Sequence, residues 1–236
     1  EAGNWELLNR PGSREQTTLN PDGGGPLMQD KLYVFGLVSA GKFKSNVYGN
    51  TTPTETKNDT PQYLMKVDWN INSDHTLEFT AFNDRSVDKV GNWDSTTPWK
   101  KPRGDFKGND KYTYGGENYV AEWRGNFGDN FAVSALAGVG KYSRAASIGA
   151  ATCPIVQDRR VAPTLILGCY TDAIVIDPGA GDKRTAYRLD ASYQLSNHKL
   201  KFGLDDETVE SQDGTRYSGG EYFFLRTLAA GAELAG

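Results

Sequence analysis

Apolar and polar residues alternate from Tyr63 to Ile71, the pattern of a β-strand with one apolar face. The apolar set holds every second residue, namely Tyr63, Met65, Val67, Trp69 and Ile71, and the residues between them include Lys66, Asp68 and Asn70. After the polar tetrapeptide NSDH at 72–75, the alternation resumes over 76–82. These features predict an antiparallel hairpin with strands at 63–71 and 76–82.

The same design recurs along the chain. A second hairpin is predicted from strands 117–127 and 131–142 around the turn 128–130, and a third from strands 185–195 and 200–207 around the turn 196–199. A less regular first hairpin has a strand at 14–20, a turn at 21–30 and a return strand at 31–44. A last strand is predicted at 221–228. The chain is therefore all-β, with about eight or nine strands.

The connections at the other end of these strands are long. They occupy 45–62, 84–116 and 143–182, and they are rich in Thr, Asn, Asp, Gly and Pro. Structureless loops of this length are uncommon in a compact domain unless they bind something or are disordered. We therefore expect short turns at one end of the sheet and long loops at the other.

The apolar face of these strands could pack against lipid or against a second sheet. The alternation lasts about nine to thirteen residues, which suits tilted membrane strands better than the shorter strands of a sandwich. Short turns opposite long loops, and aromatic residues near both ends, are also typical of membrane barrels. The sequence thus predicts an antiparallel transmembrane β-barrel, with lipid around it and a charged face toward an aqueous lumen. The residues predicted to face the lumen are Lys66, Asp68, Glu78, Glu122, Arg124, Arg188 and Asp190.

Composition narrows the alternatives. The net charge is −4 without a basic stripe, so a nucleic-acid partner is not expected. No apolar run approaches the roughly 18 residues of a membrane-spanning helix. The two cysteines, Cys153 and Cys169, fit no zinc or CxxC spacing and predict one disulfide in an oxidising compartment. Two unpaired thiols in a cytosolic protein are the alternative.

Candidate chemistry is sparse. No nucleophile, metal-ligand or phosphate-loop motif is present, so we expect no enzyme activity, metal or cofactor. The loop around 93–112 mixes aromatic and basic residues, which predicts contact with a ligand or partner. The residues of this predicted contact are Trp93, Trp99, Lys100, Lys101, Arg103 and Phe106. The same residues could instead pack on neighbouring loops or on lipopolysaccharide phosphates.

Three segments resemble a known family. The segment GGGPLMQDKLYVFG is similar to the stretch of Oar-type TonB-dependent outer-membrane receptors in which a glycine-rich turn and a K-D-K-aromatic-F-F motif begin an early barrel strand. YLMKVDWNINSDHTLEF resembles the next hairpin of that family, with its K-x-D-W-x-[IL]-x-x-x-H-x-L pattern, and YRLDASYQLSNHKLKFGLDDE resembles a later hairpin.

The resemblance implies a barrel of about 22 strands in the bacterial outer membrane. We accordingly expect residues 1–236 to be part of such a barrel, with the plug domain, the remaining strands and the region that contacts TonB outside this chain. The expected function is uptake of a scarce substrate, whose identity the sequence leaves open. One alternative is a barrel that does not transport and anchors a partner protein. A second is a soluble β-sandwich adhesin.

Overall fold

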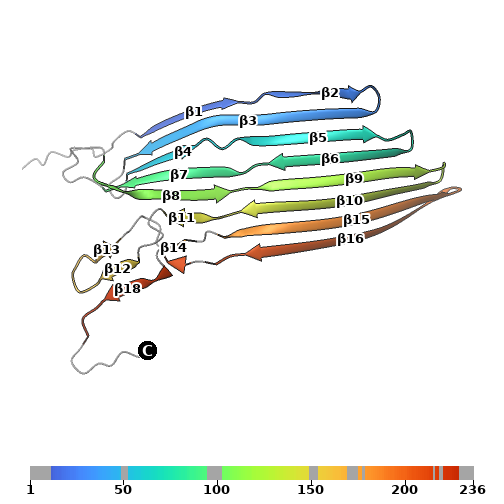
Figure 1. Cartoon of the computed structure of the whole chain (residues 1–236). Helices are drawn as coiled ribbons and strands as arrows, with labels where there is room; N and C mark the ends of the chain where they lie inside the picture. Colours follow the sequence, from blue (N-terminus) through green and yellow to red (C-terminus); the bar gives the residue numbers. More distant parts are fainter. Residues whose placement is uncertain are drawn as a thin grey trace, which may run out of the picture.

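The computed structural model describes residues 12–48, 53–94, 103–148, 154–168, 175–176, 179–214, 216–217 and 220–228. The described chain is all-β, and its main feature is one antiparallel sheet of 13 strands that does not close on itself (Figure 1). The strands of this sheet are β1 (Ser13–Leu19), β2 (Asp22–Met28), β3 (Leu32–Val47), β4 (Thr54–Asn58), β5 (Gln62–Asn70), β6 (His75–Asn83), β7 (Ser86–Trp93), β8 (Phe106–Tyr114), β9 (Glu117–Phe127), β10 (Phe131–Ser143), β11 (Ala146–Ile148), β15 (Gly181–Leu195) and β16 (His198–Gln212).

Ten of these strands join end to end in five pairs, so the sheet is a wall of eight long strands. The pairs are β1–β2, β4–β5, β6–β7, β8–β9 and β10–β11, and β3, β15 and β16 run alone. Each pair is interrupted by a break of two or three residues, such as 59–61 between β4 and β5. We call the part beside the short turns the lower storey and the part beside the long connections the upper storey.

The register does not change across the breaks. Tyr63 lies opposite Asn83 in the lower storey, and Thr54 lies opposite Asn92 in the upper storey, so nine positions on one strand match nine on the other. The same holds at the next strand pair, where Asn83 faces Glu117 and Ser86 faces Tyr114, three positions apart on each strand. Because side chains alternate with a period of two, each face of the lower storey continues into the same face of the upper storey.

The predicted hairpins are confirmed, with small changes at their ends. In the hairpin of β5 and β6, Val67 pairs with Phe79 and Asp68 with Glu78. In the hairpin of β9 and β10, Phe127 pairs with Phe131. In the third hairpin the predicted turn 196–199 is too long, because β16 begins at His198 and leaves only Ser196 and Asn197 between the strands.

The predicted turn at 21–30 is wrong, since Asp22–Met28 forms β2 and pairs with β3. Glycine weakens a strand because it has no side chain, but an aromatic ring across the pair can cover it. Gly24 lies opposite Phe35, and a Cβ at Gly24 would be 3.1 Å from the ring atom Cδ2. Pro26 is accepted because β2 pairs with a neighbour on one side only among the described strands.

The long connections are also more ordered than predicted. Large parts of 45–62 and 84–116 form β4, β7, β8 and the end of β3, which build the upper storey. Polar side chains lie on both sides of the ladder, and some of them, such as Asn92, Asp110 and Thr113, are buried, so no apolar alternation marks these segments as strands. Backbone hydrogen bonds of the ladder nevertheless continue across the break.

Two small sheets lie at the long-connection end of the wall (Figure 1). One has the order β13 (Leu165–Gly168), β12 (Ile155–Asp158) and β18 (Tyr222–Leu225), and the other pairs β14 (Val175–Ile176) with β17 (Arg216–Tyr217). The predicted last strand at 221–228 therefore exists in shortened form as β18. It runs parallel to β12 and does not extend the wall.

The wall has very little buried core. Ala81 and Ala180 are the buried hydrophobic residues in the described ranges, whereas Leu204 is 74% exposed and Phe202 63% exposed. Among the residues that the structure describes, no helix has the length and hydrophobicity needed to cross a lipid bilayer. The large apolar surface of the wall is thus free to contact something outside the described chain.

Candidate functional site

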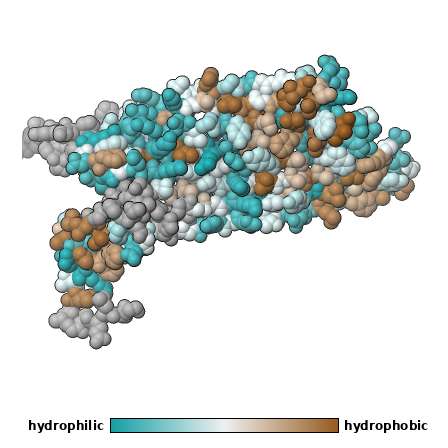
Figure 2. All heavy atoms as spheres, in the orientation of Figure 1, coloured by the Kyte–Doolittle hydropathy of each residue, from teal (hydrophilic) through white to brown (hydrophobic). Residues whose placement is uncertain are grey.

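One face of the lower storey carries a continuous apolar surface, which we call the apolar belt. Its central row runs across seven strands through Leu32, Trp69, Leu77, Trp123, Ala135, Leu189 and Leu204, which pair in register. The next row holds Val34, Val67, Phe79, Ala121, Ala137 and Tyr187. In the view of Figure 2, hydrophobic side chains gather toward the short-turn end and hydrophilic ones toward the long-connection end.

Aromatic side chains lie at both edges of the belt. At the turn end, Phe127 contacts Phe131 at a centroid distance of 5.8 Å, and Phe131 contacts Tyr193 at 6.5 Å. At the other edge, Tyr63 and Tyr119 lie within hydrogen-bonding reach of each other. Paired aromatic edges are typical of surfaces that meet the interface of a bilayer.

A charged row limits the belt at its upper edge. It includes Glu117, Lys141, Lys183 and Glu210, which succeed one another across four strands. From Phe131 to Lys141 the chain advances ten residues, or about 33 Å along the strand. At a strand tilt of about 35–45° this is a height of roughly 23–27 Å, close to the apolar band of membrane barrels.

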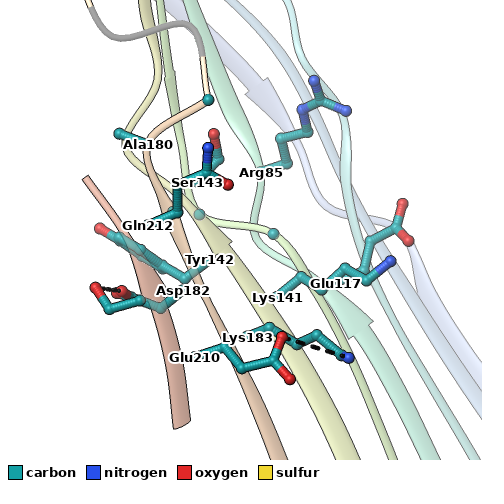
Figure 3. Close-up of a pocket in the computed structure, with 15 residues that line it drawn as sticks. Arg85, Glu117, Lys141, Tyr142, Ser143, Ala180, Asp182, Lys183, Glu210 and Gln212 are labelled. Atoms are coloured by element: carbon teal, nitrogen blue, oxygen red, sulfur yellow. Dashed lines mark hydrogen bonds and ion pairs between the residues drawn. The ribbon is translucent and has the colours of Figure 1, made fainter. Parts of the chain in front are cut away.

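A pocket opens in this charged row, where β11 and β15 separate (Figure 3). Arg85, Glu117, Lys141, Lys183 and Glu210 line it, and Lys183 Nζ lies 3.8 Å from Glu210 Oε2. Lys141 and Lys183 pair with each other and are flanked by Glu117 and Glu210, so the charges largely compensate. The pocket lies at the level where the apolar belt ends and the surface of the wall becomes hydrophilic.

Two adjacent glycines, Gly115 and Gly116, line this pocket. Gly115 has a φ of +72°, and a Cβ there would lie 2.6 Å from the carbonyl oxygen of Asp84. A Cβ at Gly116 would collide with the carbonyl oxygen of Lys141. The backbone N–H of Gly116 donates to Asp84 Oδ1 at 2.8 Å. The break between β8 and β9 therefore requires glycine at both positions.

The face opposite the belt, which we call the polar face, holds all seven residues predicted to face a lumen. Register places them together: Asp68, Glu78 and Glu122 lie side by side, and Arg188 is in the same row. Lys66 Nζ lies 3.4 Å from Asp68 Oδ1 and 3.2 Å from Glu78 Oε2. The other ion pairs of the polar face are Arg124–Glu122 at 2.8 Å, Arg188–Asp190 at 2.6 Å and Arg184–Glu207 at 2.7 Å.

These ion pairs are partly exposed, and their side chains range from 24% exposed at Glu122 to 64% exposed at Arg184. The Lys66 side chain is 37% exposed and that of Arg124 is 59% exposed. Exposed pairs contribute little stability, about 0–1 kcal/mol each. The polar face is thus suited to contact water or a hydrated solute, and its charges are arranged to compensate one another.

Three of the six residues predicted for ligand or partner contact come together in the upper storey. The Arg103 guanidinium lies 4.0 Å from the centre of the Trp93 ring and 5.5 Å from that of Tyr48. Trp93 and Phe106 form an edge-to-face pair at 5.4 Å. Arg103 also donates to Asn46 Oδ1. Trp99, Lys100 and Lys101 lie outside the described residues, as do Cys153 and Cys169, so the disulfide stays a prediction.

Next to this cluster, Glu55 lies between two lysines. Lys57 Nζ is 2.6 Å and Lys44 Nζ 3.3 Å from its carboxylate oxygens. The hydrogen bond from Lys57, supported by that from Lys44 and opposed by burial, holds the pKa of Glu55 below its usual value of 4.5. In the same way, a hydrogen bond from Lys89 lowers the pKa of Asp59. Both carboxylates are therefore ionised at neutral pH and partly neutralise the lysines around them.

Four of these upper-storey lysines form a row that the sequence analysis missed. Lys44 pairs with Lys57, Lys57 with Lys89, and Lys89 with Lys111. We call these four residues the lysine row. Part of the signal was present in the sequence, because extending the register of the predicted hairpin 63–71/76–82 past the break places Lys57 opposite Lys89. The pairs Lys44–Lys57 and Lys89–Lys111 join strands of different predicted hairpins, so the sequence analysis had no register for them.

No group of three or more His, Cys, Asp or Glu side chains suited to a metal ion occurs in the described ranges. Comparisons with protein-family models, with curated proteins and with solved structures found no match to this chain. What the fold and its surfaces define is an open, antiparallel, all-β wall with one apolar and one charged face.

Proposed function

We propose that this chain forms part of the wall of a bacterial outer-membrane β-barrel, with the apolar belt against lipid and the polar face toward an aqueous lumen. The observation that carries the proposal is the belt itself. Much of it is exposed, as at Trp69, Leu189 and Leu204, and it crosses seven strands in register. It is limited by aromatic residues and by a charged row at a height that fits a bilayer.

The exposure of the belt favours lipid over the packed core of a sandwich. Val67, Phe79 and Ala121 lie in the middle of the belt, and small residues such as Ala135 and Ala137 would fill a core poorly. Fluid acyl chains adapt to a surface of mixed large and small side chains. A protein core needs complementary packing at high density.

Within this class, the proposed activity is that of a TonB-dependent receptor, which takes up a scarce substrate. The resemblance of the hairpins to Oar-type receptors supports this activity. The upper storey supports it too, because it places aromatic and basic side chains above the belt, at the end with the long connections. The ion-paired charges of the polar face suit a hydrated lumen that a solute could enter.

Tryptophan quenching tests the membrane placement. In single-tryptophan variants of the whole protein in vesicles of brominated lipid, Trp69 and Trp123 should be quenched by the bromine. Trp93, in the upper storey, should respond to aqueous acrylamide and serves as the internal control. Quenching of Trp69 and Trp123 by acrylamide alone, with no effect of brominated lipid, would refute the membrane wall.

A binding measurement separates the receptor from an anchoring barrel. The whole protein in detergent should bind the periplasmic domain of TonB in a pull-down assay. Membrane insertion without TonB binding would favour the barrel that anchors a partner.

A further inference from the structure

The lysine row places like charges directly opposite one another across four neighbouring strands. Like charges at paired positions of an antiparallel sheet destabilise it. Glu55 contacts Lys44 and Lys57, and Asp59 lies 3.0 Å from Lys89. Lys111, at the end of the row, has no carboxylate partner within the described ranges. The row is therefore only partly neutralised by the protein.

Neighbouring positions add to this surplus of positive charge. Lys42 precedes the row by two residues on the same face, and Arg103 contacts Glu55 at 3.8 Å. With Glu15, which pairs with Lys44, this surface holds six basic side chains and three carboxylates, a surplus of three positive charges. The buried Nε of Arg103 has no hydrogen-bond partner in the part of the chain that the structure describes. An anion is the complement that such a surface lacks.

The lysine row lies on the same face of the wall as the apolar belt. Strand β3 shows this directly, because Leu32, Val34 and Val38 face the belt and Lys44 follows them at an even interval on an unbroken strand. The other three strands keep their register across the break. The lysine row thus faces outward, toward whatever surrounds the belt, and away from the polar face.

We propose that the lysine row binds the phosphorylated sugar headgroup of a glycolipid in the leaflet at the long-connection end. This inference rests on the proposed membrane placement of the wall. Ammonium groups bind phosphate oxygens as point charges, and four of them on adjacent strands match a headgroup that carries more than one phosphate.

The height of the lysine row favours a glycolipid over a phospholipid. Lys44 lies six residues beyond Val38, the residue of β3 at the upper edge of the belt, which is about 20 Å along the strand and about 14 Å in height at a 45° tilt. A phospholipid headgroup layer is only about 5–8 Å thick. Phosphates on sugars that extend above the acyl chains can reach the lysines.

The test compares two double variants of the whole protein in detergent. K89Q/K111Q removes two charges from the lysine row, and K199Q/K201Q removes two exposed charges from the polar face at the turn end. Each basic side chain near an anionic lipid surface corresponds to about fivefold in affinity. We therefore expect K89Q/K111Q to bind lipopolysaccharide with a phosphorylated core oligosaccharide about 25-fold more weakly than the unmodified protein, and K199Q/K201Q to bind it unchanged.

Titrations with other probes identify the source of the phosphate. Diphosphoryl lipid A without the core, phosphatidylglycerol and inorganic phosphate should each bind more weakly than lipopolysaccharide with a phosphorylated core. Equal affinity for phosphatidylglycerol, or no effect of K89Q/K111Q, would overturn the inference.

The tryptophan quenching measurement distinguishes an error in the glycolipid inference from an error in the membrane placement. If brominated lipid quenches Trp69 and Trp123 in both double variants, the variants are inserted and the membrane placement stands. Loss of glycolipid selectivity then counts against the lysine row alone.

Discussion

The ring of His75 stacks on the indole of Trp123, with centroids 5.6 Å apart, and meets the edge of Phe127 at 5.3 Å. This contact depends on the absence of a side chain at Gly125. A Cβ there would lie 2.5 Å from a ring atom of Trp123 and 2.7 Å from His75 Nδ1. Glycine at this position thus allows two rings from neighbouring strands to share one site at the turn end of the belt.

Gly125→Ala should displace one of the two rings and lower the free energy of unfolding by about 1–3 kcal/mol, the usual cost of overpacking. Unfolding in urea from lipid vesicles, followed by Trp123 fluorescence, measures it. Gly36→Ala is the matched control, since a Cβ at Gly36 meets nothing within 4 Å. Equal stability of the two variants would show that the rings do not occupy this site.

Glu55 gives a prediction about pH. Its folded pKa is lowered by the hydrogen bond from Lys57, so its contribution to stability is present above the unfolded value of 4.5 and is lost as the pH falls through the lowered pKa. The thermal midpoint of Glu55→Gln should be below that of the unmodified protein at pH 7, and the two should converge as the pH falls below 4.5 and through the lowered pKa. A difference that stays constant from pH 7 to pH 3 would contradict this role.

At the scale of elements, β16 presents an edge that no other described strand pairs with. It has 15 residues, pairs with β15 on one side, and is exposed along its whole length. A long exposed edge with apolar residues such as Phe202 and Leu204 readily pairs with another strand. The proposed barrel supplies such a strand from outside the described chain.

Amide hydrogen exchange of β16 tests that pairing in the whole protein in detergent. In a strand paired on one side, alternate amides point to the free edge and exchange quickly. In a strand paired on both sides, successive amides are all protected. We expect protection of successive amides from Lys199 to Val209, and fast exchange of every second one would show that β16 is a true edge.

The sequence predicted the lower storey well and the upper storey poorly. Strands such as β5 and β9 have one apolar face, so their alternation is visible in the sequence. Strands β7 and β8 carry polar residues on both faces, and only their register with the lower storey identifies them. Hydrophobic periodicity reports which apolar side chains a strand hides from water, whereas the buried side chains of these two strands include the polar residues Asn92, Asp110 and Thr113.

For the whole molecule, the same reasoning explains which sites were predictable. The charged residues of the polar face alternate with apolar ones, so their common side followed from the sequence. Trp93, Arg103 and Phe106 were chosen for their chemistry, and the structure brings them together. The lysine row was missed because its members come from four strands, three of which the sequence analysis had assigned to loops.

At this largest scale, the wall has three levels on one face: aromatic residues at the turn end, an apolar belt, and a charged zone that rises to the lysine row. The opposite face of the lower storey carries the ion-paired charged residues, together with apolar ones such as Phe35, Leu64 and Val120. Both proposals, the membrane placement and the glycolipid contact, rest on this difference between the two faces.

The unbroken register between the storeys restricts how such a wall can change in evolution. One residue inserted between Asn83 and Ser86 would rotate Lys89 and Trp93 to the other side of the sheet. Lys57 and Lys111 would then no longer have Lys89 beside them on their own face. Two inserted residues would restore the sides and only lengthen the strand. Homologous chains should therefore differ here by substitution or by even-numbered insertions, while odd-numbered ones should be confined to the connecting segments beyond Trp93.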